Sequence, residues 1–179
     1  VRDDVPRQIA ALEQALAGAG LLEIQSGFAA ADIKRLWTAR KSLSLAVKNI
    51  APLKINEDVV VPVARLASLV NAIDALGHHH RVPIVSFGHA GNGNLHVNLM
   101  VHGDDADEMA RARACRDALV EAVLGLGGSL SGEHGIGSEK RHFVDRELDA
   151  DTLAMMRDVK RLFDPNGILN PGKKLPDET

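Results

Sequence analysis

A chain of 179 residues, with hydrophobic residues at 45% and charged residues at 25%, is long enough to bury the core of about one domain. The formal net charge of −3 gives no electrostatic basis for binding nucleic acid or an anionic membrane, so we expect neither partner. The single cysteine, Cys115, excludes an intrachain disulfide framework, and no apolar run is long enough to cross a membrane. We expect a cytoplasmic protein, because we also find no targeting segment.

The N-terminal part of the chain predicts two helices joined by a short extended segment. Residues 3–18 begin with two aspartates and a proline in the first turn, and their apolar residues recur on one side. Residues 28–48 also carry apolar residues at helical spacing, and Arg40 and Ser44 share a face there. Residues 21–25 are expected to form a short strand. Spacing alone favours interpreting the Arg40 and Ser44 face as a solvated polar stripe.

The rest of the chain alternates strand and helix patterns. Residues 53–61 are rich in β-branched side chains, and Pro62 then opens a helix that should end near Gly77. The three histidines at residues 78–80 are expected in a solvated loop. Further strands are predicted at residues 83–89, 95–101 and 129–131, and further helices at residues 104–126 and 149–163.

This order of elements predicts the fold class. Strand, helix, strand, strand, helix, strand is the order of a ferredoxin-like unit, so we expect an α+β fold in which helices cover an antiparallel sheet. We expect three regions along the chain. They are an N-terminal helical part at residues 1–50, a ferredoxin-like core with a histidine-bearing hairpin at residues 51–135, and a C-terminal helix with an extended tail at residues 136–179.

The hairpin predicted within residues 88–98 brings two histidines to one face. Asn92 and Gly93 form the strongest short hairpin signal, because both accept positive φ. A two-residue loop would place His89 directly opposite His96, roughly 5 Å apart at Cβ. The alternation of the second strand puts Asn98 on the same polar face as His96. The alternative is that each histidine only caps a turn or hydrogen-bonds within the fold.

A second motif, Glu133-His134, lies in a glycine-rich loop that favours neither helix nor strand. His89, His96 and Glu133 would make a two-nitrogen, one-oxygen set for a divalent ion such as zinc or manganese, with open positions for a substrate. His134 would serve as a general base, since imidazole titrates near neutrality. The alternative is a flexible loop that carries a chance Glu–His pair.

Basic residues elsewhere suggest the kind of substrate. Arg40 and Lys54 are candidates for gripping a carboxylate, the first through a bidentate fork and the second as a point charge. A metal, a base and a carboxylate clamp suit a 2-hydroxy acid, whose hydroxyl and carboxylate oxygens can chelate an ion. Oxidation of that acid releases a hydride from Cα, and no side chain can accept a hydride, so a redox cofactor is required.

Three spaced motifs resemble the C-terminal part of FAD-linked oxidoreductases related to D-2-hydroxyglutarate dehydrogenase, D-lactate dehydrogenase and the glycolate oxidase flavoprotein subunit. The motifs are residues 88–98, residues 133–137 with Lys140-Arg141, and residues 170–173. The resemblance covers about residues 5–175. It departs from the family at the hairpin turn, where Asn92 stands in place of a common aspartate. Asparagine keeps the turn, so we expect little effect on metal binding.

The resemblance implies a role for each motif. His89, His96 and Glu133 match metal ligands, and His134 matches the proposed base. Substrate contacts are implied for four further residues, of which the first three match less securely: Arg40, Ser44, Lys54 and Asn98. Asn170 lies in the tail that, in the family, returns towards the flavin.

The family's N-terminal FAD-binding domain is absent here, and no dinucleotide-binding glycine fingerprint follows a strand. We therefore expect the substrate half of a longer enzyme, inactive alone, with FAD held mainly by the missing domain. A metal-dependent hydrolase and a non-catalytic ferredoxin-like binding or assembly domain are the alternatives. The sequence is compatible with a homodimer and specifies neither the hydroxy acid nor the electron acceptor.

Overall fold

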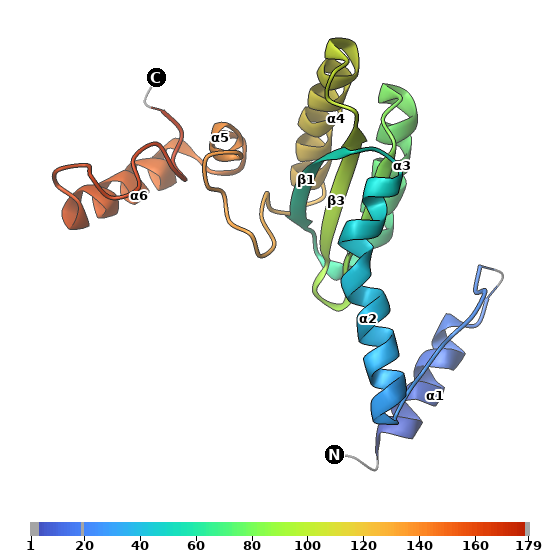
Figure 1. Ribbon diagram of the computed structural model, residues 1–179. Coiled ribbons are helices and arrows are strands. Elements are labelled where there is room, and N and C mark those ends of the chain that lie inside the picture. The colour runs from blue at the N-terminus through green and yellow to red at the C-terminus, as the bar shows by residue number, and fades with distance from the viewer. Residues whose placement is uncertain (1–3, 19, 178–179) are drawn as a thin grey trace. The chain divides into compact units, whose positions relative to one another are not determined.

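The computed structural model describes residues 4–18 and 20–177. The chain forms two compact units, Val1–Ser44 and Leu45–Thr179. The first unit contains helix α1 (Val5–Leu16) and most of helix α2 (Ala30–Ala46), as Figure 1 shows. The strand predicted at residues 21–25 is not formed, and the segment is irregular. Leu22 there is 99% exposed, because no neighbouring strand is present to cover it.

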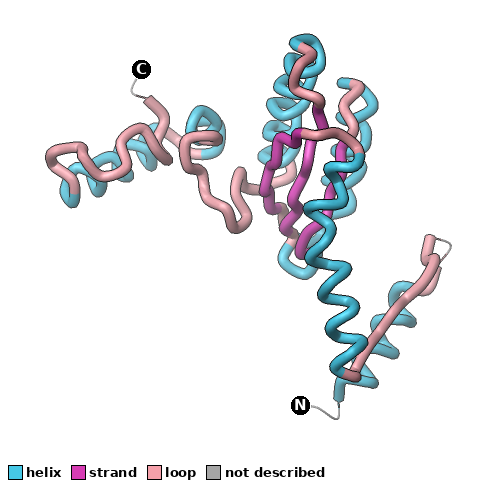
Figure 2. Tube along the Cα trace, in the orientation of Figure 1, coloured by secondary structure: helices cyan, strands magenta, loops and turns pink. Residues whose placement is uncertain are grey.

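The second unit is built on a three-stranded antiparallel sheet with the order β1-β3-β2. Strand β1 (Leu53–Val60) connects through a short 3-10 turn and helix α3 (Leu66–His80) to β2 (Ile84–His89), and β3 (Asn94–Val101) lies between them (Figure 2). This is the split βαβ arrangement of a ferredoxin-like unit, so the predicted α+β class is confirmed. The fourth predicted strand is reduced to one bridge between Val60 and Ser129.

The two faces of the sheet differ in polarity because side chains alternate along each strand. On one face the apolar residues of β3 pack into the main core, which α3 and helix α4 (Ala106–Gly125) complete (Figure 1). Asp105 caps the N-terminus of α4, where its carboxylate accepts the amides of Asp107 and Glu108. Its buried residues recur at helical spacing: Ala112, Cys115, Leu119 and Val123.

The opposite face of the sheet is largely polar and carries the candidate site. It presents Asp58 on β1, His96 on β3 and His89 on β2. A small apolar group of Val47, Ala51 and Met100 packs at one end of this face.

The C-terminal segment consists of two helices and a tail that is held by an ion pair. Phe143 begins helix α5 (Val144–Glu147), and helix α6 (Ala150–Phe163) follows. Asp149 caps α6 by accepting the amide of Thr152. Arg141 pairs with Asp177 at the end of the tail. Taken over its described residues, the chain has no helix that is both long and apolar enough to cross a membrane.

Helix α3 continues past Gly77, so the prediction that residues 78–80 form a loop is wrong. The three histidines form the last helical turn, and Arg81 ends it in the left-handed conformation with φ of 55°. Positively charged or polar side chains suit this position, because the carbonyl groups at a helix C-terminus carry partial negative charge.

Candidate metal centre

The hairpin places His89 and His96 on one face through a register that differs from the prediction. His89 pairs with Asn94, and His96 pairs with Phe87, so the predicted direct pairing of the two histidines is wrong. The loop is four residues long rather than two, because residues 90–92 form a 3-10 turn that Gly93 closes at φ of 71°. A shift of two residues preserves the face, since side chains alternate with period two. The two imidazole rings therefore still meet, with centroids 5.6 Å apart.

Three imidazole nitrogens converge on one carboxylate oxygen. The Oε1 atom of Glu133 lies 3.2 Å from Nε2 of His96 and 3.5 Å from Nε2 of His89. It lies 4.0 Å from Nε2 of His134, whose ring stacks on that of His96 at a centroid distance of 5.0 Å. The structure therefore brings the three predicted ligands and the predicted base together from β2, β3 and the loop after Gly132.

Asp58 is a member of this cluster that the sequence reasoning did not identify. It pairs directly with His96 across the sheet and is 1% exposed. Its carboxylate accepts hydrogen bonds from the Asn94 side chain at 2.7 Å and from the amides of Glu133 and His134 at 2.7 and 2.8 Å. Two adjacent acidic residues inside a β-branched strand need partners on both faces of a sheet, but the local sequence does not show which residues those partners are.

Hydrogen bonding keeps the Asp58 carboxylate charged. Burial raises the pKa of this carboxyl, but the hydrogen bonds from Asn94 and from the amides of Glu133 and His134 outweigh burial and bring the pKa to about 2. The carboxylate is therefore a fixed negative charge at neutral pH, and it ties the Glu133 loop to strand β1.

His96 is held in its neutral form with one nitrogen directed at Glu133. Burial lowers its pKa, and the charge of Asp58 opposes that effect. Its Nδ1 atom lies 3.3 Å from Oδ1 of Asp58 but makes no aligned hydrogen bond with any of the described residues. Neutral imidazole is the form that ligates metals, and its Nε2 faces the shared carboxylate oxygen.

Two sets of residues could hold a metal ion here. One group, with donor atoms all within 4.8 Å of one another, comprises Asp58, His96, Glu133 and His134. The oxygens of Asp58, however, already accept three hydrogen bonds, which suits a residue that orients ligands rather than one that binds the ion. The second set includes His89, which that group omits but whose distance from Oε1 of Glu133 lies between those of His96 and His134. The donor chemistry of His89, His96 and Glu133 fits zinc or manganese.

Two of the predicted substrate residues, Asn98 and Lys54, lie on the polar face of the sheet. Asn98 is fully buried, and its side chain donates to the carbonyls of Val85 and His96 and accepts from Asn56. A substrate contact by Asn98 would have to replace one of these bonds. Lys54 is half-buried on the same sheet face as Asn98.

The chain matches the family model described as "FAD linked oxidases, C-terminal domain" over residues 2–174. It belongs to this family. The recognition made from the three motifs is therefore confirmed.

Three differently named proteins illustrate what the chain is similar to. The chain is 32% identical to glycolate oxidase subunit GlcD of Bacillus subtilis, over 96% of the chain and 36% of that protein. It is 35% identical to D-2-hydroxyglutarate dehydrogenase of Stutzerimonas stutzeri, over 79% of the chain and 31% of that protein. It is 34% identical to D-lactate dehydrogenase of Anaerostipes hadrus, over 87% of the chain and 33% of that protein. The chain spans about a third of the length of these relatives.

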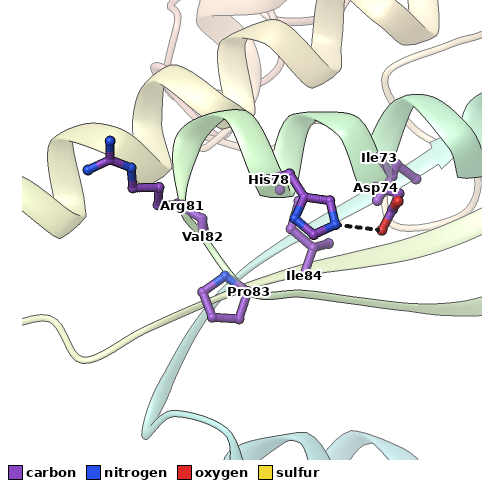
Figure 3. A pocket seen from close by; sticks show the side chains of 8 residues that line it. Ile73, Asp74, His78, Arg81, Val82, Pro83 and Ile84 are labelled. Atoms are coloured by element: carbon purple, nitrogen blue, oxygen red, sulfur yellow. Dashed lines mark ion pairs between the residues drawn. The ribbon is translucent and has the colours of Figure 1, made fainter.

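Two surface pockets of this FAD-linked oxidase C-terminal domain lie outside the histidine cluster. One, of about 470 Å³, sits where α3 ends, and there His78 lies 3.7 Å from Asp74 (Figure 3). Both side chains are mostly exposed, as expected for a solvated pair. The other, of about 540 Å³, is lined by apolar side chains of α6 and by the tail, including Asn170, which has φ of 49°.

Proposed function

We propose that this chain is the substrate- and metal-binding portion of an FAD-dependent dehydrogenase that oxidises a D-2-hydroxy acid to the 2-oxo acid. The observation that carries the proposal is the convergence of three histidines on Glu133 in a member of this oxidase family. The names of the relatives include glycolate, D-lactate and D-2-hydroxyglutarate. These acids share a hydroxyl group on the carbon next to a carboxylate.

His89, His96 and Glu133 are the proposed metal ligands. The two histidines stand on rigid strands, and the glutamate comes from a loop that Asp58 fixes to the sheet. A zinc or manganese ion held there would polarise a bound hydroxyl group and lower its pKa. Ligation by neutral imidazole is favoured at His96, because burial lowers the pKa of that ring.

His134 is the proposed general base. Its ring is about half exposed and stacks on His96, so it borders the ligands while remaining open to a substrate. It would accept the hydroxyl proton as the hydrogen on Cα leaves with its electron pair, which turns the C–O bond into a carbonyl. FAD of the parent enzyme would accept that hydride.

The substrate carboxylate is proposed to contact basic and polar side chains. Lys54 supports this assignment by its place on the sheet face that carries the proposed ligands. Asn98 would act from the same face, through its bond with the half-buried Asn56. Arg40 and Ser44 of α2 stay predicted substrate residues on the strength of the resemblance.

A flavin-binding partner is proposed to cover α6 and the tail. Large apolar side chains are unusually exposed there, with Leu162, Phe163 and Ile168 each more than 70% exposed. Such a patch indicates an interaction surface. We assign it to the N-terminal FAD-binding domain of a longer parent, with Asn170 at the contact.

Metal titration tests the ligand assignment. Isothermal titration of the metal-free chain with zinc and with manganese should give about one tight site per chain, lost in His96→Ala. The matched control is His79→Ala, because the three histidines at the end of α3, of which His78 and His79 are exposed, can bind zinc adventitiously. Loss of the tight site in His79→Ala, with retention in His96→Ala, would contradict the assignment.

Flavin reduction tests the reaction. The parent enzyme carrying the FAD-binding domain should lose its oxidised flavin absorbance when mixed anaerobically with D-lactate, glycolate or D-2-hydroxyglutarate. His134→Gln should slow this step by about a hundredfold or more while flavin and metal content stay unchanged. Bound metal with no flavin reduction by any hydroxy acid would instead favour the hydrolase alternative.

A further inference from the structure

We propose that the adjacent acidic residues Glu57 and Asp58 are positioning residues that hold the Glu133-His134 loop from the two faces of strand β1. The inference rests on the proposed function, because the position of the loop matters most if its side chains ligate an ion and accept a proton. Consecutive strand residues point to opposite faces of a sheet. One dipeptide can therefore anchor both ends of a loop that wraps around the edge of the strand.

The Asp58 anchor acts on the ligand residues themselves. The same oxygen, Oδ2, accepts the amides of Glu133 and His134, and the Ser131 hydroxyl lies 3.5 Å from it. Ser131 in turn accepts the amide of Gly135 at 2.7 Å. Charged acceptors make stronger hydrogen bonds than neutral ones, so this buried carboxylate fixes two successive backbone units.

The Glu57 anchor acts at the far end of the loop, on the helix-covered face. Glu57 is 2% exposed and pairs with Arg116 at 2.5 Å and with Lys140 at 3.2 Å. The Lys140 ammonium also donates to the carbonyls of Asp58 and Leu130, at 2.9 and 2.6 Å. The buried ammonium of Lys140 therefore connects strand β1 with both the start and the end of the loop.

Arg116 adds a further contact, since its guanidinium donates to the carbonyl of Glu139 at 3.0 Å. The loop contains neither helix nor strand between residues 131 and 139, so these side chains replace the backbone ladder that would otherwise order it. The fit is also tight. A Cβ atom added at Gly132 would lie 1.6 Å from the amide nitrogen of Asn94, the side chain that bonds Asp58.

The expected consequence is a selective effect on ligand geometry. Groups that orient metal ligands are typically worth about ten- to a hundredfold in metal affinity. Asp58→Asn cannot accept two amides with a charged oxygen, so Glu133 should lose its fixed position. Glu57→Gln removes the charged partner of Lys140 and should weaken metal binding less, because that anchor lies further from Glu133.

The first measurement is amide hydrogen exchange by NMR on the metal-free chain. In the wild type, the amides of Glu133 and His134 should exchange slowly although the loop is exposed and irregular. In Asp58→Asn they should exchange at least about tenfold faster. Unprotected amides in the wild type, or unchanged rates in Asp58→Asn, would overturn the proposal without reference to any metal.

The second measurement is zinc affinity of the same proteins. The matched control is Asp164→Asn, because Asp164 is also a buried carboxylate that accepts two successive amides, those of Ile168 and Leu169. Asp58→Asn should bind zinc about ten- to a hundredfold more weakly, and Asp164→Asn should bind it as the wild type does. Equal losses in both variants would reduce the role of Asp58 to general stability and overturn the proposal. A wild type that binds no zinc would refute the metal site, while the exchange rates would still decide the positioning role.

Discussion

Replacing Asp58 should change how the stability of the fold depends on acid. The pKa of Asp58 is about 2 in the folded chain against an ordinary 3.8, because hydrogen bonds from Asn94 and from two amides outweigh burial. Each unit of difference in pKa is worth about 1.4 kcal/mol, so the charged carboxylate contributes roughly 2–3 kcal/mol. A lowered pKa means that this stability is present above about pH 4 and is lost as pH falls towards 2. By about pH 3, roughly 1 kcal/mol of it should be gone.

The assay compares the free energy of unfolding of wild type and Asp58→Asn between about pH 6 and about pH 3. Other carboxyls with lowered pKa values, such as Asp149 and Asp164, titrate in both proteins and cancel in the difference. Far-UV circular dichroism is the appropriate signal, because the single tryptophan, Trp37, lies in the Val1–Ser44 unit. The advantage of the wild type should shrink by about 1 kcal/mol across this range. A difference that stays constant with pH would show that the charge of Asp58 does not stabilise the fold.

Three further predictions concern the core, the thiol and the loop. Leu99→Ala, at a fully buried position on β3, should lower the free energy of unfolding by about 2–5 kcal/mol in chemical denaturation. Leu162→Ala, at an exposed position, should change it by less than about 0.5 kcal/mol, and equal effects of the two substitutions would contradict the packing. Cys115 is buried, and burial raises the pKa of its thiol to about 11. A thiol reagent at mildly alkaline pH should therefore label it only after unfolding, and rapid labelling of the folded chain would contradict its burial. Gly132→Ala should weaken zinc binding by about tenfold or more. Gly91→Ala, where an added Cβ meets nothing within 4 Å, should leave the zinc affinity unchanged, and equal affinities of the two variants would show that the loop tolerates displacement.

The sequence predicted the elements that local pattern controls. Period-two alternation located β3, and helical spacing with an acidic first turn located α4. Prediction from the sequence failed where a residue distant in the chain decides whether a strand forms. Residues 21–25 have strand composition but no strand beside them, and residues 129–131 contribute a single bridge.

The candidate site shows the same division. Period two fixed the face of His89 and His96, although the loop length and so the register were wrong. Asp58 could not be assigned from local pattern, because the amides it accepts belong to residues 75 and 76 positions later. The convergence of Glu133 on the histidines depends on that long-range contact.

The most direct test of the metal site is a crystal structure of this chain grown with zinc or manganese, with anomalous scattering recorded at the metal edge. We expect one strong anomalous peak at about 2.0–2.2 Å from Nε2 of His89, Nε2 of His96 and a carboxylate oxygen of Glu133. A peak only at the histidines of residues 78–80, with no anomalous density between His89, His96 and Glu133, would contradict the ligand assignment.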